Sequence, residues 1–214
     1  MRVPAGTESA SPRISANDGR LARSARTRLA IVDALRALNH QGDLRPTAPR
    51  IAERAGVSLR TVWQHFDDFE ALLLEAGRRD FELVLQQVTP IDPGLPLGER
   101  IRLVVAQRAK TFADLAPVWR AARLHEPFSA VLRDSRDRLV RASRDELARV
   151  FATELAAVPA AVRRVTLDAL QAVANFPAWD AMHTELGLSD EQAKATLQFL
   201  VERVMADAVT GNVR

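Results

Sequence analysis

The sequence predicts an all-α protein in which a small N-terminal three-helix unit is followed by a larger helical unit. Three observations support this fold. Apolar residues recur at spacings of three and four along most of the chain, and no segment alternates like a β-strand. Residues 47–66 have the pattern of two short helices joined by a tight turn. Pro and Gly concentrate in residues 89–98, which predicts a loop between longer helices.

The composition is that of a globular protein with a substantial core. Of the 214 residues, 47% are hydrophobic, and the absence of Cys excludes disulfides and thiolate metal sites. No apolar run reaches the roughly 20 residues of a membrane span, and the N-terminus lacks the apolar core of a signal peptide. We therefore expect a cytoplasmic protein without a membrane segment, a location that the lack of Cys also favours.

The charge is distributed unevenly along the chain. Residues 1–66 contain 11 Arg and 5 acidic residues, a net charge of +6, whereas residues 67–214 carry a net charge of −3. A positive N-terminal part favours contact with a phosphate backbone. The alternative is that an Arg-rich proteome produces the same imbalance by chance.

Residues 1–23 are rich in Ser, Ala, Arg, Pro and Gly without an apolar period, which predicts a disordered basic arm. Its arginines would reach an adjacent minor groove, or the arm is a solvated tail without function. The first helix is expected over residues 24–40, because an apolar stripe runs through Leu29, Val32, Leu35 and Leu38. Gly42 is expected just beyond the end of this helix.

The spacing within residues 47–66 fits a helix-turn-helix. We expect Thr47 and Ser58 to be the N-caps of its two helices. Ala52 is small enough for the helices to cross closely, and Gly56 tolerates the left-handed backbone of a sharp turn. The expected small core consists of Ile51, Val57, Leu59, Val62 and Phe66.

Polar residues of the second helix are candidates for contact with DNA. With its apolar positions turned inward, Arg60, Thr61 and Gln64 fall on the exposed side. Arg60 can donate two hydrogen bonds to guanine O6 and N7, and Gln64 can pair with adenine N6 and N7. Thr61, Trp63 and His65 lie at the flanks, where phosphate or sugar contacts are expected. The alternative is an ordinary polar surface, with Trp63 in the core.

The helix-turn-helix and its surroundings resemble those of the TetR family of transcriptional regulators. The resemblance covers about a quarter of the chain and rests on the stretches 31–34 (IVDA), 51–58 (IAERAGVS), 61–66 (TVWQHF) and 70–73 (EALL). It implies a three-helix DNA-binding domain over residues 24–67 and a helical ligand-binding and dimerisation domain over residues 68–214. The expected DNA-contacting residues are Thr47, Ser58, Arg60, Thr61, Trp63, Gln64 and His65.

The chain departs from the family pattern in two places. Trp63 replaces the usual Tyr, so that an indole N–H takes the place of a phenolic hydroxyl. The run Asp67-Asp68-Phe69 stands where the family often has Lys, which removes one expected phosphate contact. Asp67 or Asp68 is instead expected to cap the next helix, where negative charge is favourable.

The larger unit is predicted to consist of further helices over residues 68–88, 99–115, 117–125, 128–155, 160–185 and 189–210. We place Pro117 and Pro127 in first turns and expect Pro177 to kink or interrupt its helix. Ser189 and Gln192 predict a capping box. Charges of both signs on residues 128–155 indicate a solvated, ion-paired face more than a second nucleic-acid surface.

The last two predicted helices each have a broad apolar face, which indicates a four-helix bundle with a second copy. The alternative is burial within their own domain. A pocket for an apolar or amphipathic effector is expected among the middle helices. The candidate lining residues, any aromatic of which is otherwise plain core, are Phe112, Trp119, Arg123, His125, Phe128, Asn175, Phe176, Trp179, Met182 and His183.

We found no sequence signal for an enzyme, a metal or a cofactor. The four His lack metal-ligand spacing, and there is no P-loop, dinucleotide turn or nucleophile elbow. The main hypothesis is a homodimeric regulator, a repressor that binds a palindromic operator in double-stranded DNA and is released by a small-molecule effector. The alternatives are a helical ligand-binding or protein-interaction module that no longer binds DNA, and an enzyme that turns over a bound metabolite.

Overall fold

The computed structural model describes residues 16–210, and every regular element in that range is helical, which confirms the all-α prediction. The elements are α1 (Ala16–His40), α2 (Ala48–Ala55), α3 (Leu59–His65), α4 (Phe69–Leu85), α5 (Leu97–His125), the 3-10 helix η1 (Glu126–Phe128), α6 (Ala130–Val150), α7 (Ala152–Ala156), α8 (Ala160–Val173), α9 (Phe176–Thr184) and α10 (Asp190–Thr210).

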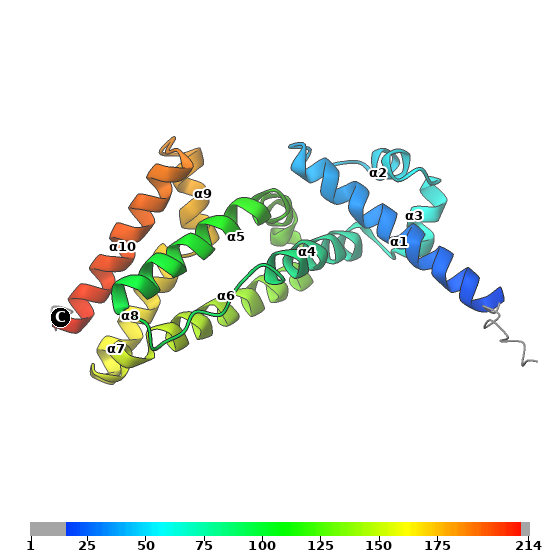
Figure 1. Ribbon diagram of the computed structural model, residues 1–214. Helices are drawn as coiled ribbons and strands as arrows, with labels where there is room; N and C mark the ends of the chain where they lie inside the picture. The colour runs from blue at the N-terminus through cyan, green and yellow to red at the C-terminus, as the bar shows by residue number, and fades with distance from the viewer. Residues whose placement is uncertain (1–15, 211–214) are drawn as a thin grey trace, which may run out of the picture.

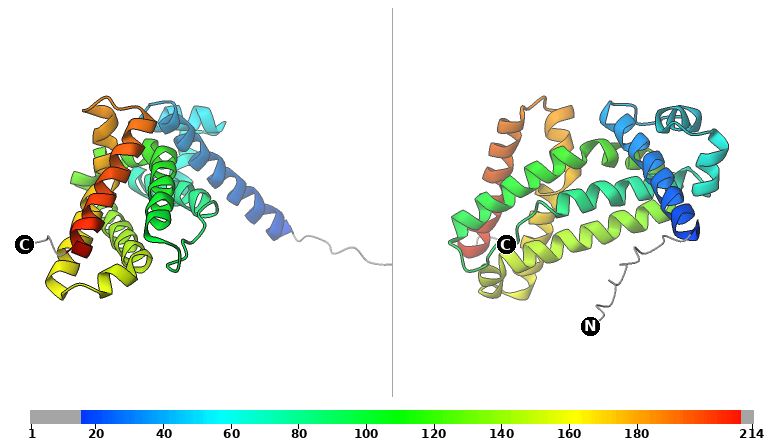
Figure 2. Two further views of the ribbon diagram at one scale, coloured as in Figure 1. Left: turned by 60° about the vertical axis from the view of Figure 1, so that its left-hand side comes forward. Right: turned by 45° about the vertical axis from the view of Figure 1, so that its right-hand side comes forward.

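The helices form an elongated molecule with two distinct ends. Figure 1 shows α1, α2 and α3 at one end and α7 to α10 at the other, with α4, α5 and α6 running between them. The right-hand view of Figure 2 shows the same arrangement, and the left-hand view shows the N-terminal part of α1 projecting beyond the neighbouring helices. The helix-turn-helix therefore lies far from α8 and α10.

The first helix begins at Ala16, eight residues earlier than predicted, so residues 16–23 are helical and not part of a disordered arm. The rest of the predicted arm, residues 1–15, lies outside the described residues. Leu21 in the added turns is 59% exposed, so burial does not hold them. Their Ala, Leu and Arg residues are strong helix formers, and Asp18 in the first turn favours the helix N-terminus. A prediction based only on the spacing of apolar residues therefore starts this helix too late.

The turn of the helix-turn-helix forms as predicted. Gly56 follows α2 with a left-handed φ of 67°. Ile51 and Val62 are fully buried, and Ala52 is 3% exposed where the two helices cross. The Ser58 side chain accepts a hydrogen bond from the Thr61 backbone N–H at 3.1 Å, which caps α3.

Two details of the motif differ from prediction. Thr47 occupies the N-cap position of α2, but its side chain makes no capping hydrogen bond. Pro49 in the first turn lacks an N–H, so one of the usual partners of an N-cap is missing. Leu59 was predicted to belong to the small core of the motif, but its side chain is 41% exposed. Because side chains lean toward the N-terminus of their helix, the first residue of α3 points past its neighbours into solvent.

The helix that follows the motif begins with the expected acidic cap. The Asp68 carboxylate accepts a hydrogen bond from the Ala71 backbone N–H at 2.7 Å. This confirms the interpretation of the Asp67-Asp68 pair as a capping signal. α4 then ends at Leu85, three residues before the predicted end.

Three predictions about the middle helices are wrong. Pro117 does not begin a new helix, because α5 continues through it as one 29-residue helix. Leu115 and Val118 are almost fully buried on either side, and this packing outweighs the roughly 3 kcal/mol that an interior Pro costs. Pro127 lies in η1 and not in the first turn of α6. The predicted helix 128–155 is broken at Phe151, where φ is −105° and ψ is 24°.

The predicted helix 160–185 is interrupted before Pro177, as expected, and forms α8 and α9. Asn175 caps α9 by accepting a hydrogen bond from the Ala178 backbone N–H at 2.8 Å. The capping box before α10 is confirmed by two reciprocal hydrogen bonds between Ser189 and Gln192, at 2.9 and 3.3 Å.

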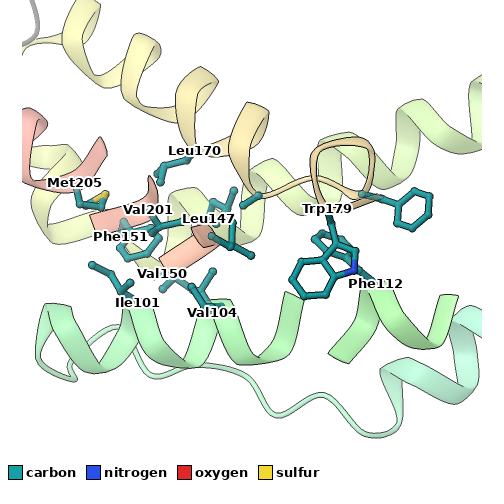
Figure 3. Close-up of a cluster of buried hydrophobic side chains, with 14 of the residues drawn as sticks. Ile101, Val104, Phe112, Leu147, Val150, Phe151, Leu170, Trp179, Val201 and Met205 are labelled. Atoms are coloured by element: carbon teal, nitrogen blue, oxygen red, sulfur yellow. The ribbon is translucent and has the colours of Figure 1, made fainter. Parts of the chain in front are cut away.

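The buried apolar side chains form two main clusters. One fills the N-terminal unit but also includes Ala121 of α5 and Leu132 of α6. The other fills the space among α5, α6, α8, α9 and α10, as Figure 3 shows. The first cluster joins the helix-turn-helix to the middle helices, so the two units share a packed boundary.

Candidate functional site

The exposed face of α3 carries the predicted base-contacting residues. Arg60, Trp63 and Gln64 are all exposed, and Gln64 follows Arg60 by one helical turn, so both lie on the same face. Within residues 16–210, no hydrogen bond or ion pair involves any of these three side chains. Trp63 is 41% exposed, which contradicts its alternative assignment to the core. The face thus presents a cation, an amide and an indole to solvent.

Contacts at both ends hold α3 in place. At its start, the Ser58 and Thr61 hydroxyls lie 2.8 Å apart in addition to the backbone cap. At its end, the Arg28 guanidinium of α1 donates a hydrogen bond to the His65 backbone oxygen and lies 4.1 Å from the centre of the Phe66 ring. The role of Arg28 is not predictable from local sequence patterns, because this contact joins residues 37 positions apart.

The remaining candidate DNA contacts border this face. Thr47 and Ser58 are exposed at the starts of α2 and α3, and Thr61 and His65 are half-buried on the flanks of α3. All seven predicted residues therefore lie on the helix-turn-helix. Asp67 is exposed just after α3, at the edge of this face.

Several predicted ligand-binding residues form a packed cluster. The rings of Phe112, Trp119, Phe176 and Trp179 lie with centroids 4.8 to 6.2 Å apart in tilted or edge-on pairs. Figure 3 shows Phe112 and Trp179 facing each other in this cluster. Phe112, Phe176 and Trp179 are at most 7% exposed, and Met182 is 6% exposed in the same core. Their arrangement is that of hydrophobic core.

The polar candidates do not converge on these rings. The His183 ring lies tilted against Trp179, with the centroids 4.8 Å apart, and its two nitrogens lie 2.9 Å from the Trp179 backbone oxygen and from the Asp190 carboxylate. Asn175 is engaged as the cap of α9. Arg123 is exposed in the last turn of α5. The ten candidates therefore do not make one site.

The other two candidates, His125 and Phe128, line a groove of about 300 Å³ at the boundary of the two units. Its walls come from the first turn of α4, from the end of α5, from η1 and from the start of α6. The lining residues are Asp68, Phe69, Glu70, His125, Phe128, Ser129 and Leu132. Five of these were not predicted as ligand contacts, because the groove joins segments more than 50 residues apart.

The His125 imidazole is the main titratable group of this groove. Its ring lies 5.1 Å from that of Phe69, and its Nε2 is buried without a hydrogen-bond partner within the described residues. Burial lowers the pKa of His125 below its ordinary value, and the nearby positive charge of Arg45 lowers it further. The neutral imidazole is therefore the favoured form in the folded protein.

This lowered pKa predicts a pH dependence of stability. In the unfolded chain, His125 has its ordinary pKa of 6.5 and takes up a proton as the pH falls through that value, whereas the folded protein resists protonation. We expect the free energy of unfolding to fall between pH 7.5 and 5.5, and to fall less in His125→Phe, which keeps the ring contact. Urea denaturation at several pH values measures this. If the free energy of unfolding fell equally with pH in both proteins, His125 would not be the source of the pH dependence.

The described residues were also searched for metal sites and membrane helices. Between Ala16 and Thr210, no group of three or more His, Asp or Glu side chains is arranged to hold a metal ion. No helix in the same part of the chain is long and apolar enough to cross a membrane.

Comparison with known proteins identifies the fold. No protein-family model matches the chain, and no curated protein matches it in sequence. Among solved structures, a transcriptional regulator from Rhodococcus sp. Rha1 is 19% identical with a TM-score of 0.65, over 87% of this chain and 97% of that one. A TetR-like transcriptional regulator from Rhodococcus sp. RHA1 is 18% identical with a TM-score of 0.55, over 92% and 99%.

Proposed function

We propose that this chain, which has the fold of TetR-like transcriptional regulators, is a homodimeric DNA-binding repressor of the cytoplasm. It would bind a palindromic operator in double-stranded DNA and leave it when a small apolar or amphipathic effector binds. The observation that carries the proposal is the exposed face of α3, where Arg60 and Gln64 stand one turn apart without partners in the described chain.

The surroundings of α3 support placement in a major groove. The helix is held at both ends, so little ordering of its backbone remains to oppose binding. Arg23 and Arg26 are exposed on the N-terminal part of α1, where they add positive charge near the motif. Trp63 offers an indole N–H to a phosphate, in place of the phenolic hydroxyl of the family pattern.

The proposal is tested by titrating the protein against a labelled fragment of the DNA upstream of its own gene. We expect saturable binding that weakens steeply with salt, since phosphate contacts release counterions. A scrambled fragment of the same length should bind more weakly at every salt concentration. Equal affinity for both fragments, or no binding, would favour the alternative module that no longer contacts DNA.

The dimer is proposed to form through α8 and α10. Much of their apolar surface, including Leu170, Leu197 and Val201, is buried in the core of the same chain. Two large apolar side chains remain outside that core, Val165 on α8 at 47% exposure and Phe199 on α10 at 56%. These helices lie side by side, so their outer faces together offer a surface for a second copy.

Replacing Phe199 with Asp should shift the chain toward monomers. We expect the dimer dissociation constant to rise at least about ten-fold, because a carboxylate would be buried without a partner at the interface. The fold should persist, since the Phe199 side chain is largely exposed within one chain. Sedimentation equilibrium measures the constant. Leu186→Asp, at a 67% exposed position outside both helices, is the control and should leave it unchanged.

Two contacts would carry an effector signal to α3. The buried carboxylate of Asp80 in α4 accepts a hydrogen bond from Arg36 of α1 at 2.6 Å. Ala121 and Leu132 from the middle helices are part of the apolar core under the helix-turn-helix. A movement of α4, α5 or α6 would therefore shift the unit that carries α3. Release of DNA follows only if the effector binds the moved state more tightly than the DNA-bound state.

A further inference from the structure

We propose that the groove between the first turn of α4 and η1 binds a small organic cation with an aromatic or bulky apolar body, and that this ligand changes the affinity for DNA. The second half of the proposal rests on the proposed function. The first half, binding of the cation, does not. The site differs from the packed aromatic cluster that the sequence suggested.

The apolar walls of the groove suit the body of such a ligand. Phe128 is 91% exposed, more than any other large apolar side chain in the described chain. Phe69 forms a second wall, and its ring contacts that of His125 in a tilted arrangement with the centroids 5.1 Å apart. The faces of aromatic rings attract cations, most strongly where water is partly excluded. A volume of about 300 Å³ suffices for one ring with a substituted ammonium group.

The charges of the groove select a cation over an anion. Glu70 is half-buried in the wall and makes no ion pair within the described residues. Asp68 lies beside it and uses one carboxylate oxygen for its capping hydrogen bond. His125 adds no positive charge when its imidazole is neutral, the form that burial favours. Arg45 is near His125 but does not line the groove.

The position of the groove connects its occupant to DNA binding. Phe69 is only three residues beyond Phe66, the buried residue that follows α3. Phe69 and Leu132 line the groove and also pack in the apolar core of the helix-turn-helix unit. A ligand between them would change the distance between α4 and α6 and so the placement of α3. By linkage, the factor by which the ligand alters DNA affinity equals the factor by which DNA alters ligand affinity.

Isothermal titration of the full-length protein with benzyltrimethylammonium tests the binding site, with benzoate as a ligand of similar size and opposite charge. We expect saturable binding of one cation per chain and no binding of benzoate. Phe128→Ala and Glu70→Gln should each weaken cation binding by about five-fold. Phe128 is 91% exposed and Gln has the size and shape of Glu, so the fold should be unaffected. Leu186→Ala and Glu185→Gln, at exposed positions elsewhere, are the matched controls and should leave binding unchanged.

The proposal of a cation site is overturned if the cation does not bind, if benzoate binds equally well, or if neither groove variant weakens cation binding. The regulatory half is tested by repeating the DNA titration with saturating benzyltrimethylammonium. An unchanged DNA affinity would overturn that half alone. If the cation binds as expected but the protein without ligand does not bind its upstream DNA, the proposed function is wrong and the cation site is still supported.

Discussion

Replacing both Arg60 and Gln64 with Ala will remove sequence-specific DNA binding and leave the protein folded. Each side chain can form two hydrogen bonds to one base, and a good pair of this kind contributes roughly 1 to 3 kcal/mol of discrimination. The double variant should therefore lose about 2 to 6 kcal/mol, which is at least about 30-fold in affinity for the upstream DNA. Binding to scrambled DNA should fall much less, because phosphate contacts remain. Fluorescence anisotropy with both fragments measures the difference.

The control is Arg138→Ala on α6, which removes a positive charge from an exposed position far along the chain from α3. It should leave binding to both fragments almost unchanged. Equal losses on the upstream and scrambled fragments in the double variant would mean that these residues contact phosphate and not bases. An unchanged affinity on both would mean that α3 does not face DNA.

Phe112→Ala will destabilise the protein by about 3 to 5 kcal/mol, the usual cost of removing a phenyl ring from a packed core. Phe112 is 2% exposed and contacts the rings of Trp119, Phe176 and Trp179, so its removal leaves a cavity among three aromatic neighbours. Urea denaturation followed by Trp fluorescence measures the free energy of unfolding, since two of the chain's Trp residues lie in this cluster.

Phe128→Ala is the matched control, because it is the same chemical change at a 91% exposed position. Its effect on stability should be within about 0.5 kcal/mol. A loss below about 1 kcal/mol for Phe112→Ala would show that the cluster is loosely packed. That result would restore the sequence-based prediction of a ligand pocket lined by these rings.

The helix-turn-helix was largely predictable because its signals are local. Gly56 marks the turn through its own backbone preference, and Ser58 and Asp68 mark helix starts through bonds to residues three positions on. Errors arose where tertiary packing outweighs local preference, as at Pro117 inside α5. The early start of α1 was missed because helix propensity, and not an apolar stripe, sustains those turns.

The candidate ligand sites were less predictable, because they depend on contacts between distant segments. The aromatic residues from 112 to 182 could be identified as large and apolar, but only their packing shows that the rings fill the space between the helices. The groove joins Phe69 and Glu70 to Phe128, about 60 positions later, and no spacing in the sequence connects them. The position of Arg28 over Phe66 is equally non-local.

The central claim is that two copies of α3 contact two half-sites of one operator, and footprinting of the upstream DNA tests it most directly. We expect two protected patches related by a palindrome and centred about 10 base pairs apart, or a multiple of that, which matches helices about 34 Å apart. Protection should disappear in the Arg60→Ala and Gln64→Ala double variant. A single patch, uniform protection regardless of sequence, or protection that survives the double variant would contradict the account.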